Sequence, residues 1–151
     1  MNYLVVNICE HTRPNAETLT ALLAGDPDQI GFEFCDLSQE DTFDAYKTHI
    51  NQAEVYIVGH GSLGKEEVVD EQDRGIVNIA KIMEWCKTYG AAAVIDTCCY
   101  PEQRLAKVKE LKLKTPYHCK QDLKKPVTPG ICKNDTVPGF LAAQGIKQMY
   151  P

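Results

Sequence analysis

Long apolar runs are absent from this sequence. No segment approaches the roughly 18 consecutive apolar residues that mark a membrane-spanning helix, so the sequence predicts no membrane partner. The first residues, MNYLVVNICEH, are apolar, but they lack the basic n-region and the long apolar h-region of a secretory signal peptide. We therefore expect a cytoplasmic protein.

Clusters of basic side chains are also missing. The formal net charge is −5, and the first hundred residues contain no stripe of lysine and arginine. Proteins that bind nucleic acid usually present such a patch, because cationic side chains neutralise the phosphates. The sequence therefore predicts no nucleic-acid partner.

The seven cysteines include no CxxC pair, which argues against a zinc ribbon. Their odd number, and their frequent place inside apolar runs, indicate buried thiols in a reducing compartment. His118, Cys119 and Cys132 invite a metal hypothesis, but a fourth ligand would have to come from Cys98 or Cys99. That spacing matches no standard zinc pattern, and we expect neither a metal nor another cofactor.

Apolar runs and amphipathic stretches alternate along the chain. The predicted strands are 3–9, 31–37, 53–59, 91–96 and 115–119, and the predicted helices are 15–24, 41–50, 78–89, 101–111 and 139–145. Residues 64–75 contain five acidic side chains and are predicted to form an exposed loop or a small hairpin. Such alternation predicts a mostly parallel sheet with helices on both faces, a three-layer α/β sandwich, and we expect residues 1–151 to form one domain.

Two predicted strands end on reactive side chains. The run VYIV is followed by Gly59-His60-Gly61, and the run AAAVI is followed by Asp96, Thr97 and Cys98. One predicted helix separates the two strands, so we expect them to be neighbours about 4.8 Å apart. Ligands of parallel α/β sheets bind beyond the carboxyl ends of the strands, where His60 and Cys98 would share a substrate.

This arrangement resembles the caspase–gingipain–legumain group of cysteine peptidases, which share the caspase-hemoglobinase fold. The pattern of that group is an apolar strand ending in His-Gly, a helix, and an apolar strand followed by an acidic or small residue, any residue and the nucleophilic cysteine. The matching segments here are 55–61, 78–89 and 91–98. The resemblance covers roughly residues 1–120 and implies a single caspase-like domain that cleaves peptide or protein substrates.

Carried over by position, the resemblance implies that Cys98 is the nucleophile and His60 its proton-transfer partner. The backbone N–H groups of Gly61 and Cys98 would form the oxyanion hole. These roles suit the residues, because a thiolate attacks the carbonyl, an imidazole protonates the leaving amine, and a glycine allows close approach of the backbone. Asp96 occupies the usual acidic position, and we interpret it as a structural residue that holds the following loop by backbone hydrogen bonds.

The residues after Cys98 read CYP, where many members of the group have a small residue and a glycine. This departure, with the short chain, leaves open an inactive caspase-like domain that binds or regulates. It also leaves Cys99 as a rival nucleophile, because alternation along a strand points neighbouring side chains to opposite faces.

Two further hypotheses concern charge. Cys98 and Arg104 satisfy the C-x5-R spacing of a thiol phosphatase. The intervening loop has no glycine, has a proline without an N–H, and carries Glu102, which would repel phosphate. The acidic stretch 65–73 follows His60 closely and would favour a basic residue in the substrate.

Overall fold

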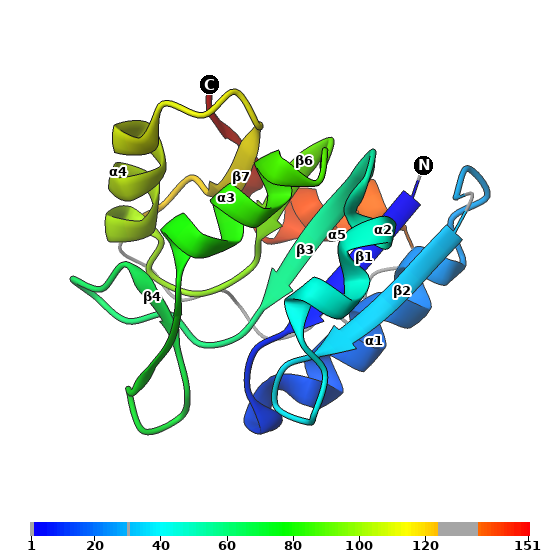
Figure 1. The fold of residues 1–151 in the computed structure, drawn as a ribbon, viewed down its shortest axis with the longest axis horizontal. Coiled ribbons are helices and arrows are strands. Elements are labelled where there is room, and N and C mark those ends of the chain that lie inside the picture. The colour runs from blue at the N-terminus through cyan, green and yellow to red at the C-terminus, as the bar shows by residue number, and fades with distance from the viewer. Residues whose placement is uncertain (1, 30, 124–135) are drawn as a thin grey trace.

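One central sheet organises the molecule, shown as a computed structural model that describes residues 2–29, 31–123 and 136–151 (Figure 1). The strands in spatial order are β2 (Gly31–Asp36), β1 (Asn2–Asn7), β3 (Ala53–Val58), β6 (Ala93–Asp96), β7 (Tyr117–Lys120) and β8 (Ile146–Tyr150). The first five are parallel, and β8 runs antiparallel to β7. The predicted mostly parallel α/β fold is confirmed.

Helices cover both faces of this sheet (Figure 1). The α-helices are α1 (Arg13–Ala24), α2 (Lys47–Ile50), α3 (Ile79–Thr88), α4 (Glu102–Leu111) and α5 (Val137–Ala143), and two 3₁₀ turns are η1 (Glu10–Thr12) and η2 (Phe43–Tyr46). In the described part of the chain, no helix has both the length and the apolar character to span a membrane.

The apolar strands are explained by this double cover. In β1, Leu4 and Val6 pack in the cluster that contains α3 and α4, whereas Tyr3 and Val5 pack in the cluster that contains α1 and α5. A strand covered on both faces needs apolar residues at consecutive positions, because successive side chains point to opposite faces. The same holds for β3, which lies next to β1.

Helix α3 shows how the local sequence sets an element. The side chain of Asn78 accepts a hydrogen bond from the backbone N–H of Ala80 at 2.9 Å and so caps the first turn. The buried residues of the helix recur at the spacing that the sequence predicts: Ile79, Ile82, Met83 and Cys86. This face belongs to the same core cluster as Val55 and Ile57 of β3.

A second sheet is a small antiparallel hairpin formed by β4 (Glu67–Val69) and β5 (Gly75–Asn78). It begins within the acidic stretch 64–75, where the sequence predicts a loop or small hairpin, and its second strand continues to Asn78. The hairpin is confirmed, and it is longer than the predicted stretch. Strand β8 is a further element that the sequence analysis did not predict, because this short edge strand alternates only weakly and has exposed residues Lys147 and Gln148.

Candidate functional site

The segments that follow β3 and β6 lie side by side at the carboxyl edge of the sheet. Strand β3 pairs with β6 in parallel, with Ile57 opposite Asp96, and the N–H of Thr97 donates to the carbonyl of Ile57 at 3.1 Å. Beyond this point Gly61 touches the other segment, since a Cβ atom added to it would lie 1.7 Å from the carbonyl oxygen of Cys99. The predicted meeting of the two strand ends is therefore confirmed, and position 61 has no room for a side chain.

His60 is positioned by the hairpin as well as by β3. The N–H of Val69 donates to the carbonyl of His60 at 2.8 Å, and the N–H of His60 donates back to Val69 at 3.3 Å. Gly59 permits this contact, because a Cβ atom there would lie 2.5 Å from Val68 and 3.0 Å from Ile8. The backbone of His60 is thus fixed on two sides, while its side chain stays half-buried.

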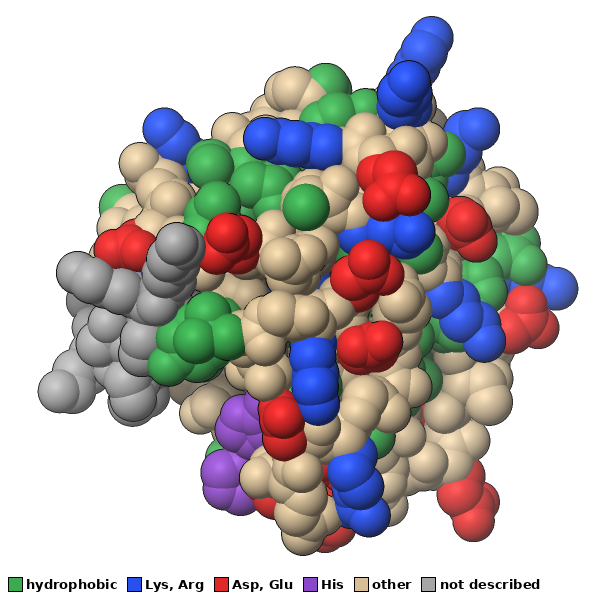
Figure 2. All heavy atoms as spheres, turned by 90° about the vertical axis from the view of Figure 1, so that its left-hand side faces the viewer, with side chains coloured by type: hydrophobic (Ala, Val, Ile, Leu, Met, Phe, Trp, Pro, Cys, Tyr) green, Lys and Arg blue, Asp and Glu red, His purple; other side chains and the backbone are tan. Residues whose placement is uncertain are grey.

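The side-chain partner of His60 is His11, a residue that the sequence analysis did not single out. Nε2 of His60 lies 2.8 Å from Nδ1 of His11, and the ring centroids are 4.9 Å apart. Figure 2 shows histidine side chains next to one another on the face it presents, beside an acidic side chain. Burial lowers the pKa of His60, and the neighbouring His11 lowers it further, whereas Glu71 and Asp70 act in the opposite direction. His60 is therefore held toward its neutral form, the form that accepts a proton.

A buried polar network fixes the segment that carries His11. Nδ2 of Asn7, at the end of β1, donates to the carbonyl of Cys9 at 2.8 Å and to Oδ1 of Asp36 at 2.9 Å. The hydroxyl of Thr12 donates to Oδ1 of Asn7 at 2.8 Å. These groups are buried, and each hydrogen bond offsets the free-energy cost of removing the polar group from water. A conformation without these bonds would leave that cost uncompensated. The chain therefore leaves β1 on a defined path into η1, where His11 lies.

Cys98 is buried. Its exposed fraction is 1%, it belongs to the core cluster that includes Ile8 and Leu105, and its Sγ lies 4.0 Å from the carbonyl oxygen of Ile57. Burial raises the pKa of the Cys98 thiol well above its ordinary value, and the neighbouring Asp96 raises it further. Within the described residues, no hydrogen bond joins Cys98 to His60. The thiol is thus held as a neutral, inward-facing group in this conformation.

Asp96 makes the backbone hydrogen bond to the loop after β6 that its interpretation as a structural residue predicts. Its Oδ1 accepts the backbone N–H of Cys98 at 2.9 Å, so that N–H is not directed at a substrate in this conformation. Its Oδ2 accepts from Nε of Arg104 at 2.7 Å and from the hydroxyl of Tyr117. The second predicted oxyanion donor, Gly61, lies against the same loop.

Arg104 also binds the loop after β6, through hydrogen bonds from its guanidinium group. Its side chain is fully buried in α4, and Nη2 donates to the carbonyl oxygens of Cys98 at 3.1 Å and Cys99 at 3.0 Å. With Nε on Asp96, the guanidinium satisfies the loop backbone and an internal carboxylate. This geometry gives the thiol-phosphatase hypothesis no support, because a phosphate clamp needs these donors to face a ligand.

Cys99 is the more exposed cysteine of the pair, with a half-buried side chain. The next residue, Tyr100, has φ of 48°, a left-handed conformation that is unfavourable for a bulky side chain. Such a residue stores strain of roughly 1–3 kcal/mol, which the surrounding contacts must hold. The loop that contains both cysteines is therefore held by hydrogen bonds with Asp96 and Arg104, and it also includes a strained residue.

Two of the five acidic residues in the hairpin stretch are engaged in ion pairs. Oδ2 of Asp70 lies 2.7 Å from Nε of Arg74, and Oδ2 of Asp73 lies 3.0 Å from Nζ of Lys65. Glu71 is exposed and acts electrostatically on His60. The acidic character that a basic substrate residue would meet is therefore smaller than the count of acids in the stretch suggests, and the basic-substrate hypothesis stays a prediction.

No metal centre is found in the part of the chain that the structure describes, where no three His, Cys, Asp or Glu side chains are grouped to hold an ion. Cys132, one of the three residues of the metal hypothesis, lies outside the described residues. His118 and Cys119 lie in β7, and burial lowers the pKa of His118.

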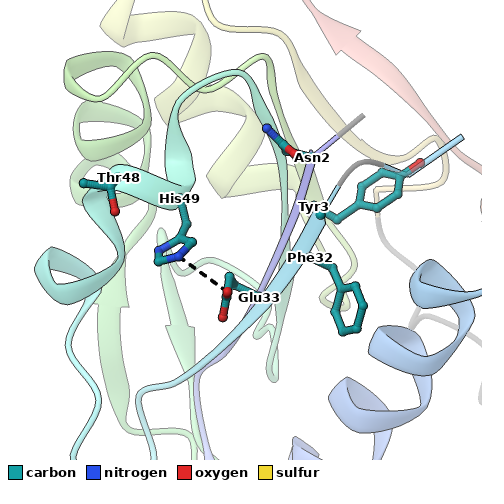
Figure 3. Close-up of a pocket in the computed structure, with 7 residues that line it drawn as sticks. Asn2, Tyr3, Phe32, Glu33, Thr48 and His49 are labelled. Carbon is teal, nitrogen blue, oxygen red and sulfur yellow. Dashed lines mark ion pairs between the residues drawn. The ribbon is translucent and has the colours of Figure 1, made fainter.

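A separate pocket of about 180 Å³ lies at the opposite, amino edge of the sheet (Figure 3). His49 and Glu33 point toward one another there, with 3.4 Å between Nε2 and Oε1. The remaining lining residues are Asn2, Tyr3, Gly31, Phe32 and Thr48. None of these lining residues is a nucleophilic thiol, so the carboxyl edge remains the candidate catalytic region.

Comparisons of the chain with protein-family models, with curated proteins and with solved structures found no match. The residues at the carboxyl edge, and their geometry, therefore carry the functional proposal.

Proposed function

We propose that this chain is a caspase-like cysteine endopeptidase, with His60 as the proton-transfer partner of a thiol in the loop after β6. The observation that supports it most directly is the parallel pairing of β3 with β6, which brings His60-Gly61 and Cys98-Cys99 to one edge of the sheet. The α/β sheet with helices on both faces suits the caspase-like fold that the sequence resembles. The substrate would be a peptide or protein.

The chemistry follows from the residue types. His60 takes the thiol proton, and the thiolate forms a bond with the peptide carbonyl carbon while the carbonyl electrons move to oxygen. The N–H of Gly61 is a suitable donor to that oxyanion. As the carbon–nitrogen bond breaks, the leaving amine takes the proton from His60, and water then hydrolyses the thioester with His60 again accepting a proton.

We propose Cys98 as the nucleophile, as the resemblance implies, in a conformation with the loop opened. A thiol with a raised pKa and no solvent access reacts slowly, so the Cys98 side chain must turn outward first. The left-handed Tyr100 makes departure from the present conformation less costly, since opening releases its strain. Cys99 is the alternative, because it is already half-exposed and next to Gly61.

The decisive experiment is cleavage of a peptide library by the wild-type chain and by Cys98→Ala, Cys99→Ala and His60→Ala, with circular dichroism as the folding check. Loss of cleavage in Cys98→Ala and His60→Ala, with Cys99→Ala largely active, is the expected result. Cys86→Ala is the matched control, because Cys86 is a buried thiol in α3. Loss in Cys99→Ala alone would move the nucleophile to Cys99, and cleavage that survives both cysteine variants and His60→Ala would refute the proposal.

A second candidate function is a caspase-like domain that binds or regulates without catalysis. The burial of Cys98 and the engagement of its N–H by Asp96 favour this alternative. A peptide-derived electrophile separates the two functions by mass spectrometry of the native protein. Labelling at Cys98 or Cys99 that depends on His60 supports the peptidase, and absence of both labelling and cleavage supports the binding domain.

A further inference from the structure

We propose that His11 is a positioning residue for His60, holding the His60 ring through Nε2 so that Nδ1 is the nitrogen that exchanges the catalytic proton. This inference rests on the proposed function and adds a residue to that same site. It begins from the 2.8 Å separation between Nδ1 of His11 and Nε2 of His60.

The contact constrains the protonation of both rings. An N–H···N hydrogen bond contains one hydrogen, so one of the two facing nitrogens carries a proton and the other a lone pair. When His60 donates from Nε2, its Nδ1 carries the lone pair and is ready to act as a base. Two fully protonated rings would place N–H against N–H with like charges, and the contact would break.

The same contact serves after the proton has been transferred. His60 is then an imidazolium, and its Nε2–H donates to the lone pair on Nδ1 of a neutral His11. The ring orientation is kept through the step, which is the role that a carboxylate or carbonyl has in other acid–base pairs. His11 is exposed, so its remaining nitrogen can exchange protons with solvent.

The fold brings His11 and His60 together and fixes the backbone on both sides of the contact. Strand β1 lies next to β3, and β3 lies next to β6, so three consecutive strands of the sheet supply His11, His60 and the cysteines at one edge. The path of the chain from β1 to His11 is fixed by the buried bonds of Asn7 and Thr12. The backbone of His60 is fixed by its bridge to Val69.

Other charged groups surround His60 without replacing His11. From the hairpin, Glu71 and Asp70 favour its protonated form, but Asp70 is already paired with Arg74. From the β6 side, Arg104 lies beyond Gly61 and is paired with Asp96. His11 is the group whose ring nitrogen lies within hydrogen-bond distance of the His60 ring, and it opposes protonation of His60 only when both rings are charged.

The test compares wild type, His11→Ala and His11→Gln in the full chain. Glu10→Gln is the control, because Glu10 is the exposed neighbour of His11 and its ion-pair partner is Arg13, at 3.9 Å. The His60 pKa is measured by NMR of the imidazole signals, and the pH profile of kcat/KM is measured in parallel. His11→Ala is expected to shift the His60 pKa and the acid limb of the profile in the same direction, and to lower kcat about tenfold or more with little change in KM.

Glutamine supplies an amide oxygen that accepts from Nε2–H without carrying charge, so His11→Gln is expected to restore part of kcat. An unchanged His60 pKa and acid limb in His11→Ala would overturn the inference while leaving the peptidase intact. If the wild-type chain shows no cleavage, the proposed function fails by itself. The NMR titration then decides the histidine contact, where a shift of the His60 pKa in His11→Ala supports it and no change overturns it.

Discussion

The two halves of the candidate site are held in opposite ways. The histidine half lies between η1 and the hairpin, with the side chains of His60 and His11 half-buried and exposed, respectively. The cysteine half is tied to the interior, because Arg104 and Asp96 bond the backbone around Cys98. The proposed acid–base group, His60, is therefore accessible in this conformation, while the proposed nucleophile, Cys98, is buried. Under the proposed function, the loop after β6 would have to open before Cys98 could react.

The largest expected effect comes from removing the interior attachment of the cysteine half. Arg104→Met should lower the free energy of unfolding by about 3–5 kcal/mol, because it leaves the buried carboxylate of Asp96 without its cation. Urea denaturation measures this. Lys107→Met is the control on the same helix, since its pair with Glu110 at 3.5 Å is partly exposed, and it should cost less than about 0.5 kcal/mol. Equal losses in the two variants would contradict the attachment.

The next effect probes the contact between the two halves. Gly61→Ala should lower the free energy of unfolding by about 1–3 kcal/mol, because the new methyl group cannot fit against the backbone of Cys99. Gly25→Ala is the matched control, since a Cβ there would meet its nearest atom at 3.5 Å in an ordinary contact. Thermal denaturation of both variants measures the difference, and a harmless Gly61→Ala would show that the halves are not in contact.

A kinetic comparison sharpens the contrast between the two cysteines. In the native protein, iodoacetamide should alkylate Cys99 at least about tenfold faster than Cys98. The reason is that the rate depends on how exposed the thiol is and on how much of it is thiolate. Peptide mass spectrometry over time gives both rates, and buried Cys86 is the internal reference for a slow thiol. If Cys98 reacts as fast as Cys99, the closed loop is not the dominant state in solution.

The smallest expected effect concerns pH and the histidine half. The pKa of His60 is lowered in the folded protein, so between its ordinary value near 6.5 and its folded value the unfolded chain binds more protons. Stability should therefore fall as pH decreases below about 6.5, and the fall should level off below the folded pKa. The slope measured between about pH 7 and 5 should be smaller in His60→Gln. His118 has a lowered pKa in both proteins and leaves a common background, and an unchanged slope would remove His60 from the pH dependence.

Much of the fold follows from local patterns. Apolar residues stand at consecutive positions in β1, β3 and β6 and at helical spacing in α3. The order of these elements predicts a parallel sheet. The neighbouring ends of β3 and β6 follow from that order, because one helical crossover joins adjacent parallel strands. His11 was within reach of the same rule, since it follows the carboxyl end of β1, the other neighbour of β3.

What the sequence determined by itself is the alternation of elements and, through it, the edge of the sheet where the histidine and the cysteines gather. Only the tertiary structure decided that the Cys98 side chain points into the core and that Arg104 binds the loop backbone. It also decided the pairing of His11 with His60. Periodicity records which face of its own element a residue occupies. Contacts between side chains distant in the chain depend on burial and hydrogen-bond satisfaction, which are set only when the segments pack together.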